Sequence, residues 1–277
     1  AEEIAMLDVV SGGRIISGFV RGIGPEYFSL AVNPTHSRER FYEAAELILR
    51  AWTEEGPFPF DGKFYRYPYV NPWPRPIQKP HPPVWCPSQG STETVEWAAK
   101  RRFPYLMVFT PIKRIAQIYS EYREACERYG YTASRYQLTV NLPIVVAEND
   151  AKAERIAREN ALWVYNVGLR MSTPFYQPPG YTTEPSLRRV LENRPKLPTE
   201  LTFEDLEEGG YIICGSPATV RDKLKVFSEE LRAGIVCSGM NGGTHEKTLE
   251  MMQLFAEEVM PHFREDAAVD ETAGVGR

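Results

Sequence analysis

A glycine followed by hydroxyl side chains stands where a short apolar stretch leads into a helix. Residues 83–99 (PVWCPSQGSTETVEWAA) predict a strand, a turn at Gly90 and a helix that begins near Ser91. The first N–H groups of a helix have no partner inside it, and the helix dipole is positive there, so an anion is favoured. The hydroxyls of Ser91, Thr92 and Thr94 would add donors. The pattern predicts a phosphate site, and an ordinary N-cap is the alternative.

Two arginines stand where they can serve an anion. Arg21 follows the apolar stretch 14–20, at a point where a strand runs out into a loop, the usual place for ligands in parallel α/β proteins. Arg38 lies in the first turn of a helix expected over 37–53, where the dipole disfavours a cation unless an anion shares the site. An ion pair of Arg38 with Glu39 or Glu43 on a solvated face is the alternative.

Strands and helices alternate along the chain. Strands are expected to begin near residues 15, 84, 105, 138 and 235, and helices cover 1–10, 37–53, 91–101, 112–129, 150–168, 184–193, 216–233 and 245–263. This order favours an α/β fold with a parallel sheet and helical crossovers. In the first helix the apolar stripe is Ile4, Leu7 and Val10, and the glycines at 12 and 13 end it.

The chain is expected to form one domain over 1–265 with a flexible tail at 266–277. Insertions are expected at about 55–82, with a small hairpin around 63–70, and at 171–210, a length typical of lids. Five strands leave two possibilities, because a closed parallel barrel needs eight. The sheet is open, or the fold is a (β/α)8 TIM barrel that lacks its first three β/α units in this chain. A start in mid-helix favours the second possibility.

Composition excludes several classes of function. The 277 residues include 32 basic and 37 acidic side chains, and without a basic stripe nucleic acid is not an expected partner. Apolar runs are only strand-sized, so no membrane partner is expected. Four cysteines, at 86, 126, 214 and 237, lack the spacing of a zinc site or redox pair, and we interpret them as reduced thiols of a cytoplasmic protein. No histidine has an acidic or nucleophilic partner at useful spacing.

The sequence resembles the bacterial-luciferase-like, flavin-dependent monooxygenases. Seven short segments follow one another in the family's order: AEEIAMLD with SGGR (1–14), GFVRG (18–22), FDGKFY (60–65), PIQKPHPP (76–83), GSTET with WAA (90–99), CGSP (214–217) and LFAEEVMP (254–261). Each is weak alone, and their order is what makes them specific. The family's fold is a (β/α)8 barrel with an insertion, and the first segment matches its third helix.

The resemblance implies reduced FMN at the carboxyl ends of the strands, where it and O₂ oxidise a small organic substrate. It also implies a flavin reductase as electron source and a homodimer or heterodimer. Arg21 matches a flavin-contacting arginine and Arg38 a phosphate-binding one. The matching phosphate turn and its neighbours are Ser88, Gly90, Ser91, Thr92 and Thr94. The family's catalytic histidine and acidic residue belong to the amino-terminal strands, so the catalytic residues here are unknown.

Three alternatives stay open at this point. A deazaflavin (F420)-dependent oxidoreductase of the same superfamily would transfer hydride and ignore O₂, whereas a flavin-binding partner subunit would not be catalytic. Phosphate can also bind near the last strands of a barrel, where Gly242, Gly243 and Thr244 begin the final helix. The aromatic 171–185 segment and Phe109 suggest an apolar substrate.

Overall fold

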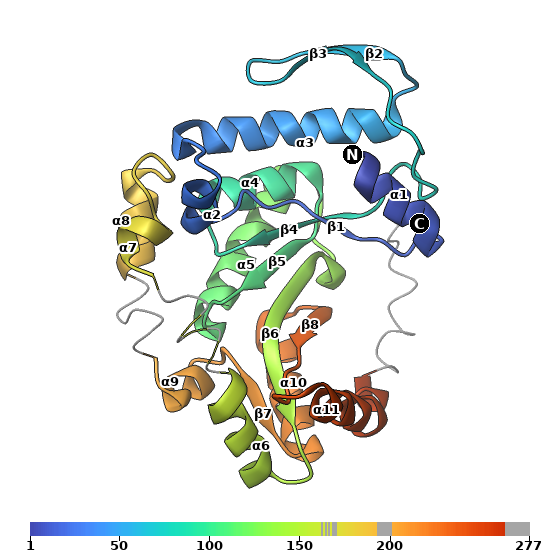
Figure 1. The fold of residues 1–277 in the computed structure, drawn as a ribbon. Helices are drawn as coiled ribbons and strands as arrows, with labels where there is room; N and C mark the ends of the chain where they lie inside the picture. The colour runs from blue at the N-terminus through green and yellow to red at the C-terminus, as the bar shows by residue number, and fades with distance from the viewer. Residues whose placement is uncertain (162, 164, 166, 168–170, 193–200, 264–277) are drawn as a thin grey trace. The chain divides into compact units, whose positions relative to one another are not determined.

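The computed structural model describes the 277-residue chain except residues 162, 164, 166, 168–170, 193–200 and 264–277. The chain divides into two compact units (Figure 1). The first comprises Ala1–Pro87 with Met171–Asn193, and the second comprises Ser88–Arg170 with Arg194–Arg277. A single domain over 1–265 stays a prediction, and the tail predicted at 266–277 lies outside the described residues.

The first unit contains a parallel strand pair, a hairpin and five helices among its described residues. Strand β1 (Ser17–Gly18) runs parallel to β4 (Val84–Ser88). Strands β2 (Phe58–Asp61) and β3 (Arg66–Val70) form the predicted hairpin, which begins earlier than expected. The helices are α1 (Glu2–Ser11), α2 (Gly24–Ser29), α3 (Ser37–Thr53), α7 (Thr173–Tyr176) and α8 (Glu184–Glu192), with a 3-10 turn at Pro34–His36.

Helix α3 has the bounds that its apolar period predicts. It buries Ser37, Ala45, Leu49, Ala51 and Trp52, and its other residues are half-buried or exposed. At its carboxyl end, Nη1 of Arg75 donates hydrogen bonds to the carbonyl oxygens of Ala51 at 2.9 Å and Glu54 at 2.5 Å. These contacts satisfy carbonyls that the helix itself leaves without partners.

Helix α1 forms as predicted, but its expected buried stripe is wrong. Leu7 and Val10 are exposed, whereas Ala5 and the carboxylate of Asp8 are buried. Asp8 accepts hydrogen bonds from the backbone N–H groups of Ile77 and Gln78 at 2.8 and 3.0 Å, and from the Gln78 side chain at 2.7 Å. A buried charge is tolerated when it is hydrogen-bonded in this way, and these bonds fix which face of the helix turns inward.

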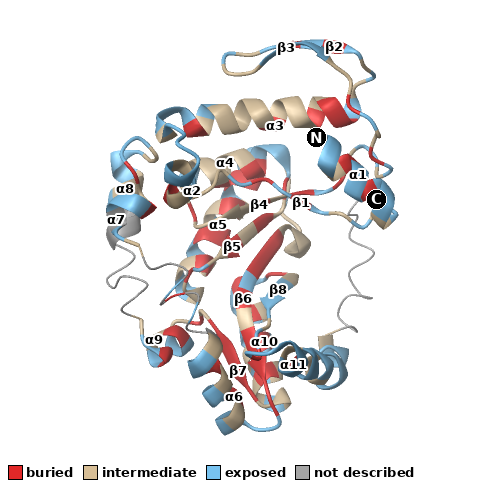
Figure 2. Ribbon diagram, viewed as in Figure 1, coloured by how far each residue is buried: buried red, intermediate tan, exposed pale blue. Residues whose placement is uncertain are grey.

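The second unit is built around one long strand, β6 (Leu138–Val146), which is almost continuously buried (Figure 2). Strands β5 (Tyr105–Val108), β7 (Ile213–Gly215) and β8 (Ile235–Gly239) all pair with it in parallel. The long helices of this unit are α4 (Thr92–Arg101), α5 (Ile112–Arg128), α10 (Pro217–Leu231) and α11 (His245–Glu258). Parallel strands that are covered by helices confirm the predicted α/β class.

Strand β7 pairs with the last three residues of β6 and was not predicted. Helix α10 buries four apolar residues that recur at helical spacing, Val220, Leu224, Phe227 and Leu231. Helix α11 buries Met251 and is followed by the buried Val259, whereas Leu249 and Met252, which the apolar period predicts to be buried with Val259, are exposed. Helix α2 lies between β1 and α3, where the sequence predicts neither a helix nor a strand.

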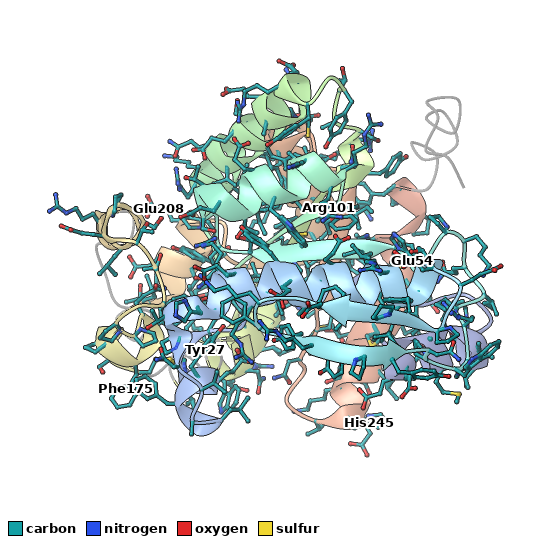
Figure 3. The ribbon with its side chains drawn as sticks, turned by 90° about the horizontal axis from the view of Figure 1, so that it is seen from above. Tyr27, Glu54, Arg101, Phe175, Glu208 and His245 are labelled. Carbon is teal, nitrogen blue, oxygen red and sulfur yellow. The ribbon has the colours of Figure 1, made fainter. Side chains whose placement is uncertain are left out.

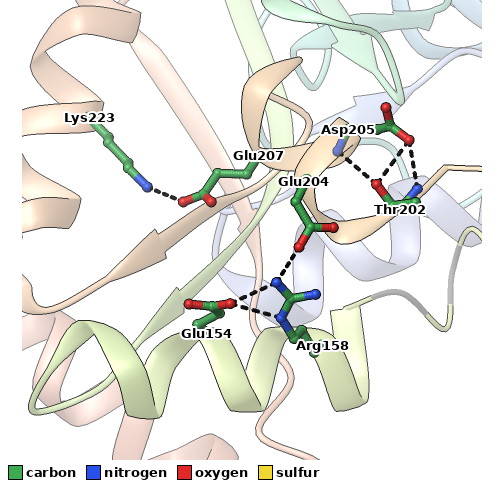
Figure 4. Close-up of polar contacts among 7 residues, drawn as sticks. All are labelled: Glu154, Arg158, Thr202, Glu204, Asp205, Glu207 and Lys223. Carbon is green, nitrogen blue, oxygen red and sulfur yellow. Dashed lines mark hydrogen bonds and ion pairs between the residues drawn. The ribbon is translucent and has the colours of Figure 1, made fainter.

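Charged side chains tie the short helix α9 (Phe203–Glu208) to its neighbours (Figure 4). Arg158 forms ion pairs with Glu204 of α9 and, at 2.8 Å, with Glu154. Glu154 belongs to helix α6 (Asp150–Ile156), and this helix continues into a π-helical turn at Ala157–Ala161. Lys223 of α10 lies 2.6 Å from Glu207. Such exposed pairs contribute little individually, so α9 is held mainly by its buried Phe203 and Leu206. No helix among the described residues has both the length and the apolar character to span a bilayer.

Candidate functional site

Helix α4 begins at the residue that its hydroxyl pattern predicts. Ser91 is the N-cap, and its Oγ accepts a hydrogen bond from the Thr94 N–H at 3.3 Å. The hydroxyls of Ser91 and Thr94 lie 2.7 Å apart, and Thr92 is the first helical residue. Three hydroxyl side chains therefore surround the positive end of a ten-residue helix, an arrangement that suits an anion.

Gly90 allows the turn before α4 to pack closely on α5. Its φ is +92°, and a Cβ at this position would lie 2.2 Å from Cδ1 of the fully buried Ile118. The Gly90 N–H donates to the hydroxyl of Ser88 at 3.1 Å, so Ser88 closes the turn. Gly90 thus shapes the predicted phosphate turn through its backbone conformation.

In the first unit, the side chain of Arg21 reaches the residue that precedes Arg38. Nη1 of Arg21 donates to the hydroxyl of Ser37 at 2.9 Å and to the carbonyl oxygen of Tyr181 at 2.5 Å. Ser37 is buried and begins α3, so it directly precedes Arg38. The guanidinium carbon of Arg21 also lies 3.9 Å from the centroid of the Tyr181 ring. Arg21 is therefore held against the amino terminus of the helix that carries Arg38.

The acidic residues near Arg38 have other hydrogen-bond or ion-pair partners. Glu43 accepts hydrogen bonds from the backbone N–H groups of residues 63, 64 and 65 at 3.0, 2.8 and 2.7 Å. Glu39 lies 3.9 Å from Nδ1 of His36. Glu43 is thus engaged by the backbone of residues 63–65, and an ion pair with Glu39 or Glu43 stays the alternative for Arg38.

Three residues of this arrangement escaped the sequence prediction. By its position in the sequence, Ser37 is an ordinary residue at the start of a helix, and Tyr27 carries no signal of its own. In the structure, Tyr27 donates a 2.5 Å hydrogen bond to the Arg21 carbonyl oxygen. Tyr181 lies 160 positions from Arg21 in sequence. No local signal connects residues at that separation.

The predicted site residues fall into two groups, one in each unit. Arg21 and Arg38 belong to the first unit, whereas Ser88, Gly90, Ser91, Thr92 and Thr94 belong to the second. Within each unit the members of a group lie together. That all of them bind one cofactor stays a prediction.

In the glycine turn before α11, which is the alternative phosphate site, the backbone N–H groups donate to side chains nearby. The Gly242 N–H donates to the hydroxyl of Thr248 at 3.0 Å, and the Gly243 N–H donates to Oδ1 of Asn241 at 2.9 Å. The hydroxyl of Thr244 caps α11 by accepting from the Lys247 N–H. Both glycine amides would have to exchange these partners to bind phosphate, which makes this turn the weaker candidate.

Contrary to the expectation from spacing, one histidine, His36, has an acidic neighbour, because Oε1 of Glu39 lies 3.9 Å from its Nδ1 in an exposed pair. Nδ1 of His81 lies 2.8 Å from the Pro82 carbonyl oxygen, and its ring packs against Trp52 with centroids 6.0 Å apart. Within the described part of the chain, no cluster of three or more histidine, cysteine or acidic side chains is arranged to hold a metal ion.

Phe109 is the strained residue of the second unit that lies nearest to a strand end. It follows β5 directly and has a φ of +50°, which is rare for an aromatic residue. Its ring is 38% exposed and meets the ring of Tyr165 edge to face at 6.3 Å. Strained residues of this kind cluster at ligand sites, so Phe109 stays a candidate for contact with the substrate.

Comparison with known proteins places the chain in a family. The family model described as luciferase-like monooxygenase matches residues 1–233. The chain is 25% identical to 2,5-diketocamphane 1,2-monooxygenase 1 of Pseudomonas putida, over 93% of this chain and 71% of that protein.

Two solved structures share the fold. One is the oxygenating constituent of 3,6-diketocamphane monooxygenase of Pseudomonas putida in complex with FMN, with a TM-score of 0.70 and 18% identity over 93% of this chain and 74% of that one. The other is the coenzyme F420 dependent tetrahydromethanopterin reductase of Methanopyrus kandleri, with a TM-score of 0.65 and 21% identity over 94% and 77%. The match to the family model extends over most of the chain, and the protein belongs to the luciferase-like monooxygenase family.

Proposed function

We propose that this protein is the oxygenating component of a two-component, FMN-dependent monooxygenase that receives FMNH₂ from a separate flavin reductase. Family membership supports a flavin-dependent monooxygenase. A relative named as a diketocamphane monooxygenase and a structural neighbour described as an oxygenating constituent in complex with FMN support the cofactor and the division of labour.

The observation that carries the proposal is the pairing of Arg21 and Arg38 at the start of α3. FMN ends in a phosphate dianion, and riboflavin does not. Arg21 is anchored to Ser37, the residue before Arg38, so both arginines lie near one helix amino terminus. Guanidinium groups match phosphate oxygens in geometry and charge, and a dianion would offset their mutual repulsion.

The hydroxyl turn of α4 supplies a second set of proposed phosphate ligands. Ser91 and Thr94 already share a hydrogen bond, and Thr92 adds a third hydroxyl at the same helix start. The composition of this turn fits a phosphate ester, because helix N–H groups and hydroxyls are its usual neutral donors. Ser88 and Gly90 give the turn its shape.

When bound, FMNH₂ supplies two electrons and O₂ supplies the oxygen, so that one oxygen atom enters the substrate and the other leaves as water. The arginines hold the phosphate and thereby orient the cofactor. Phe109, half exposed at the end of β5, offers an apolar ring to the substrate. We infer a small, apolar organic substrate from this exposed aromatic residue.

The test is to ask which reduced cofactor the protein binds and whether O₂ is consumed. We expect anaerobic titration to detect binding of FMNH₂ but not of reduced F420, and the FMNH₂ complex to consume O₂ on mixing. Binding of F420 without O₂ consumption would instead identify a hydride-transferring enzyme. Binding of FMNH₂ followed by the same O₂ consumption as free FMNH₂ would identify a non-catalytic partner subunit. Light scattering on the same sample tests the further expectation of a dimer.

The arginine assignment has its own test. Arg21→Ala should weaken FMN binding by about 1–3 kcal/mol, or roughly 5- to 150-fold, because a charge-assisted hydrogen bond is lost. Arg188→Ala is the matched control, since Arg188 forms an exposed pair with Glu184 at 2.6 Å and such pairs contribute little. An unchanged FMN titration for Arg21→Ala would count against the assignment.

A further inference from the structure

Tyr181 contacts Arg21 in two ways and holds the chain next to it. Its ring lies under the Arg21 guanidinium at 3.9 Å, and its carbonyl oxygen accepts the 2.5 Å hydrogen bond from Nη1. Its hydroxyl donates to the Gly22 carbonyl oxygen at 2.6 Å. A single residue of the 171–193 segment thus fixes both the side chain of Arg21 and the backbone that follows it.

Tyr27 completes the arrangement from the other side. Its ring meets that of Tyr181 at a centroid distance of 5.6 Å and an angle of 66°, which is an edge-to-face contact. Its hydroxyl donates to the Arg21 carbonyl oxygen. We call Tyr27, Ser37 and Tyr181 the arginine clasp.

The docking of the 171–193 segment depends on backbone-to-backbone packing. A Cβ at Gly24 would lie 1.9 Å from the carbonyl oxygen of Phe175, so only glycine allows α2 and α7 to approach this closely. The rings of Phe28 and Phe175 pack at 4.8 Å. Figure 3 labels Tyr27 and Phe175 on these two neighbouring helices.

The charges of both proposed phosphate-binding arginines affect the pKa of the Tyr181 phenol. Burial raises the pKa of Tyr181, and the positive charges of Arg21 and Arg38 oppose this rise. Two guanidinium groups near one another repel, and the repulsion grows as water is excluded. The negative face of an aromatic ring stabilises a cation stacked on it, so Tyr181 offsets part of the cost of keeping Arg21 close to Arg38.

We propose that Tyr181 is a positioning residue that presets Arg21 beside Arg38 for the phosphate of the cofactor. The proposal rests on the proposed function, because it takes these arginines as phosphate ligands. Since Tyr181 belongs to the 171–193 segment, phosphate binding and docking of this segment stabilise one another. Linkage requires that each strengthens the other by the same factor.

The ratio of riboflavin to FMN dissociation constants isolates the phosphate contribution. The two ligands share the isoalloxazine and ribityl groups and differ in the phosphate alone, so damage to the rest of the site cancels in the ratio. We expect Tyr181→Leu, which removes the ring, to lower this ratio about 5- to 30-fold relative to the wild type, because Arg21 loses its cation–π contact. Tyr181→Phe keeps the ring and should lower it only a few-fold.

Two further variants separate positioning from a general loss of structure. Arg21→Ala/Tyr181→Leu should lower the ratio no further than Arg21→Ala alone, because Tyr181 acts through Arg21. Gly24→Ala leaves every clasp residue intact and displaces the segment, so it should lower the ratio as well. Tyr69→Leu, at an exposed tyrosine of the hairpin, is the matched control.

Inorganic phosphate supplies a readout that needs no flavin. It should slow proteolytic cleavage within residues 171–193 in the wild type and fail to do so in Tyr181→Leu. If the wild type binds riboflavin as tightly as FMN, the phosphate site itself is wrong. If Arg21→Ala lowers the ratio but Tyr181→Leu and Gly24→Ala leave it at the wild-type value, the phosphate site stands and the role of Tyr181 is refuted.

Discussion

Single atoms decide which glycine turn is the better phosphate candidate. At the turn before α11, both glycine amides are committed to side-chain acceptors. At the turn before α4, Gly90 instead serves packing, because its missing Cβ makes room for Ile118. The two turns look alike in sequence. The Gly90 N–H also donates to a side chain, the Ser88 hydroxyl, so what separates the two turns is the group of hydroxyls at Ser91, Thr92 and Thr94 and the close contact with Ile118.

Gly90→Ala tests the packing requirement. The substitution strains a φ of +92° and places a methyl group 2.2 Å from Cδ1 of Ile118. We expect the free energy of unfolding to fall by about 2–5 kcal/mol, from backbone strain of about 1–2 and overpacking of about 1–3 kcal/mol. Urea denaturation measures this change.

A second substitution separates the two contributions. Ile118→Val removes the clashing Cδ1 and alone should cost about 0.5–1.5 kcal/mol. The double variant should therefore be more stable than the sum of the single effects predicts, by roughly 1 kcal/mol. Strict additivity would mean that Ile118 is not the obstacle and that backbone strain accounts for the whole effect.

Asp8 is the most deeply buried carboxylate of the described chain and joins α1 to residues 77 and 78. Asp8→Ala leaves three donors without their acceptor, so we expect a loss of about 3 kcal/mol in the free energy of unfolding. Asp61→Ala serves as control, because Asp61 is 88% exposed and should change stability by less than about 0.5 kcal/mol. Equal effects of the two substitutions would contradict the assigned role.

At the scale of elements, one carboxylate of α3 joins this helix to the hairpin, in addition to the contacts of Arg50 with the rings of Phe58 and Phe60. Glu43 of α3 accepts the backbone N–H groups of the hairpin turn at residues 63–65. Gly62 leaves room for it, since a Cβ there would lie 2.0 Å from Oε1 of Glu43 and the carboxylate would have to move. Two β-strands with little core of their own thus depend on an anchor that titrates.

The attachment should therefore depend on pH. Burial raises the pKa of Glu43, but the three backbone hydrogen bonds and the charge of Arg66 outweigh it and hold the pKa below its usual value of 4.5. A lowered pKa in the folded state contributes stability above the unfolded pKa, and this contribution is lost as the pH falls through the folded value.

Glu43→Gln isolates this contribution. Its amide oxygen can still accept the N–H groups, but the side chain carries no charge at any pH. The wild type should be more stable than Glu43→Gln at pH 7, and the melting temperatures should converge as the pH falls from 5 to 3. A difference that stays constant over this range would show that the charge of Glu43 plays no part.

Elements with a clear apolar period were predictable, and elements defined by distant partners were not. The bounds of α3 and the buried face of α10 follow from their own residues. The inward face of α1 depends on Asp8, whose partners lie 69 and 70 positions away. Strand β7 is three residues long and forms only because β6 extends far enough to pair with it.

For the whole molecule, the candidate site was likewise predictable only where its residues carry local signals in the sequence. Arg21, Arg38 and Ser91 carry local signals, because each stands at a strand end or helix start where charge or a hydroxyl has a physical consequence. The partner that holds Arg21 comes from the 171–193 segment, whose sequence suggests a lid but not a contact with residue 21. An insertion can therefore be recognised as an insertion while the residue it positions stays hidden.

The four cysteines report on the packing of both units at once. All are free, with Cys86 buried in the first unit, Cys126 and Cys214 buried in the second, and Cys237 half-buried. Burial raises the pKa of Cys86 to about 12 and that of Cys214, where the charge of Glu207 adds to burial, to about 11. Because the thiolate is the reactive form, these rises lower its population at neutral pH about a thousandfold for Cys86 and about a hundredfold for Cys214, and burial also blocks the reagent.

We therefore expect Cys237 alone to react with a thiol reagent in the native protein, and the other three to react only when their unit opens. Mass spectrometry of each labelled peptide at increasing urea concentration measures this. Since Cys86 belongs to the first unit and Cys214 to the second, their labelling midpoints give the stability of each unit separately. Coincident midpoints would mean that the two units unfold as one cooperative structure. Rapid labelling of Cys86 without denaturant would contradict the burial of this residue in β4.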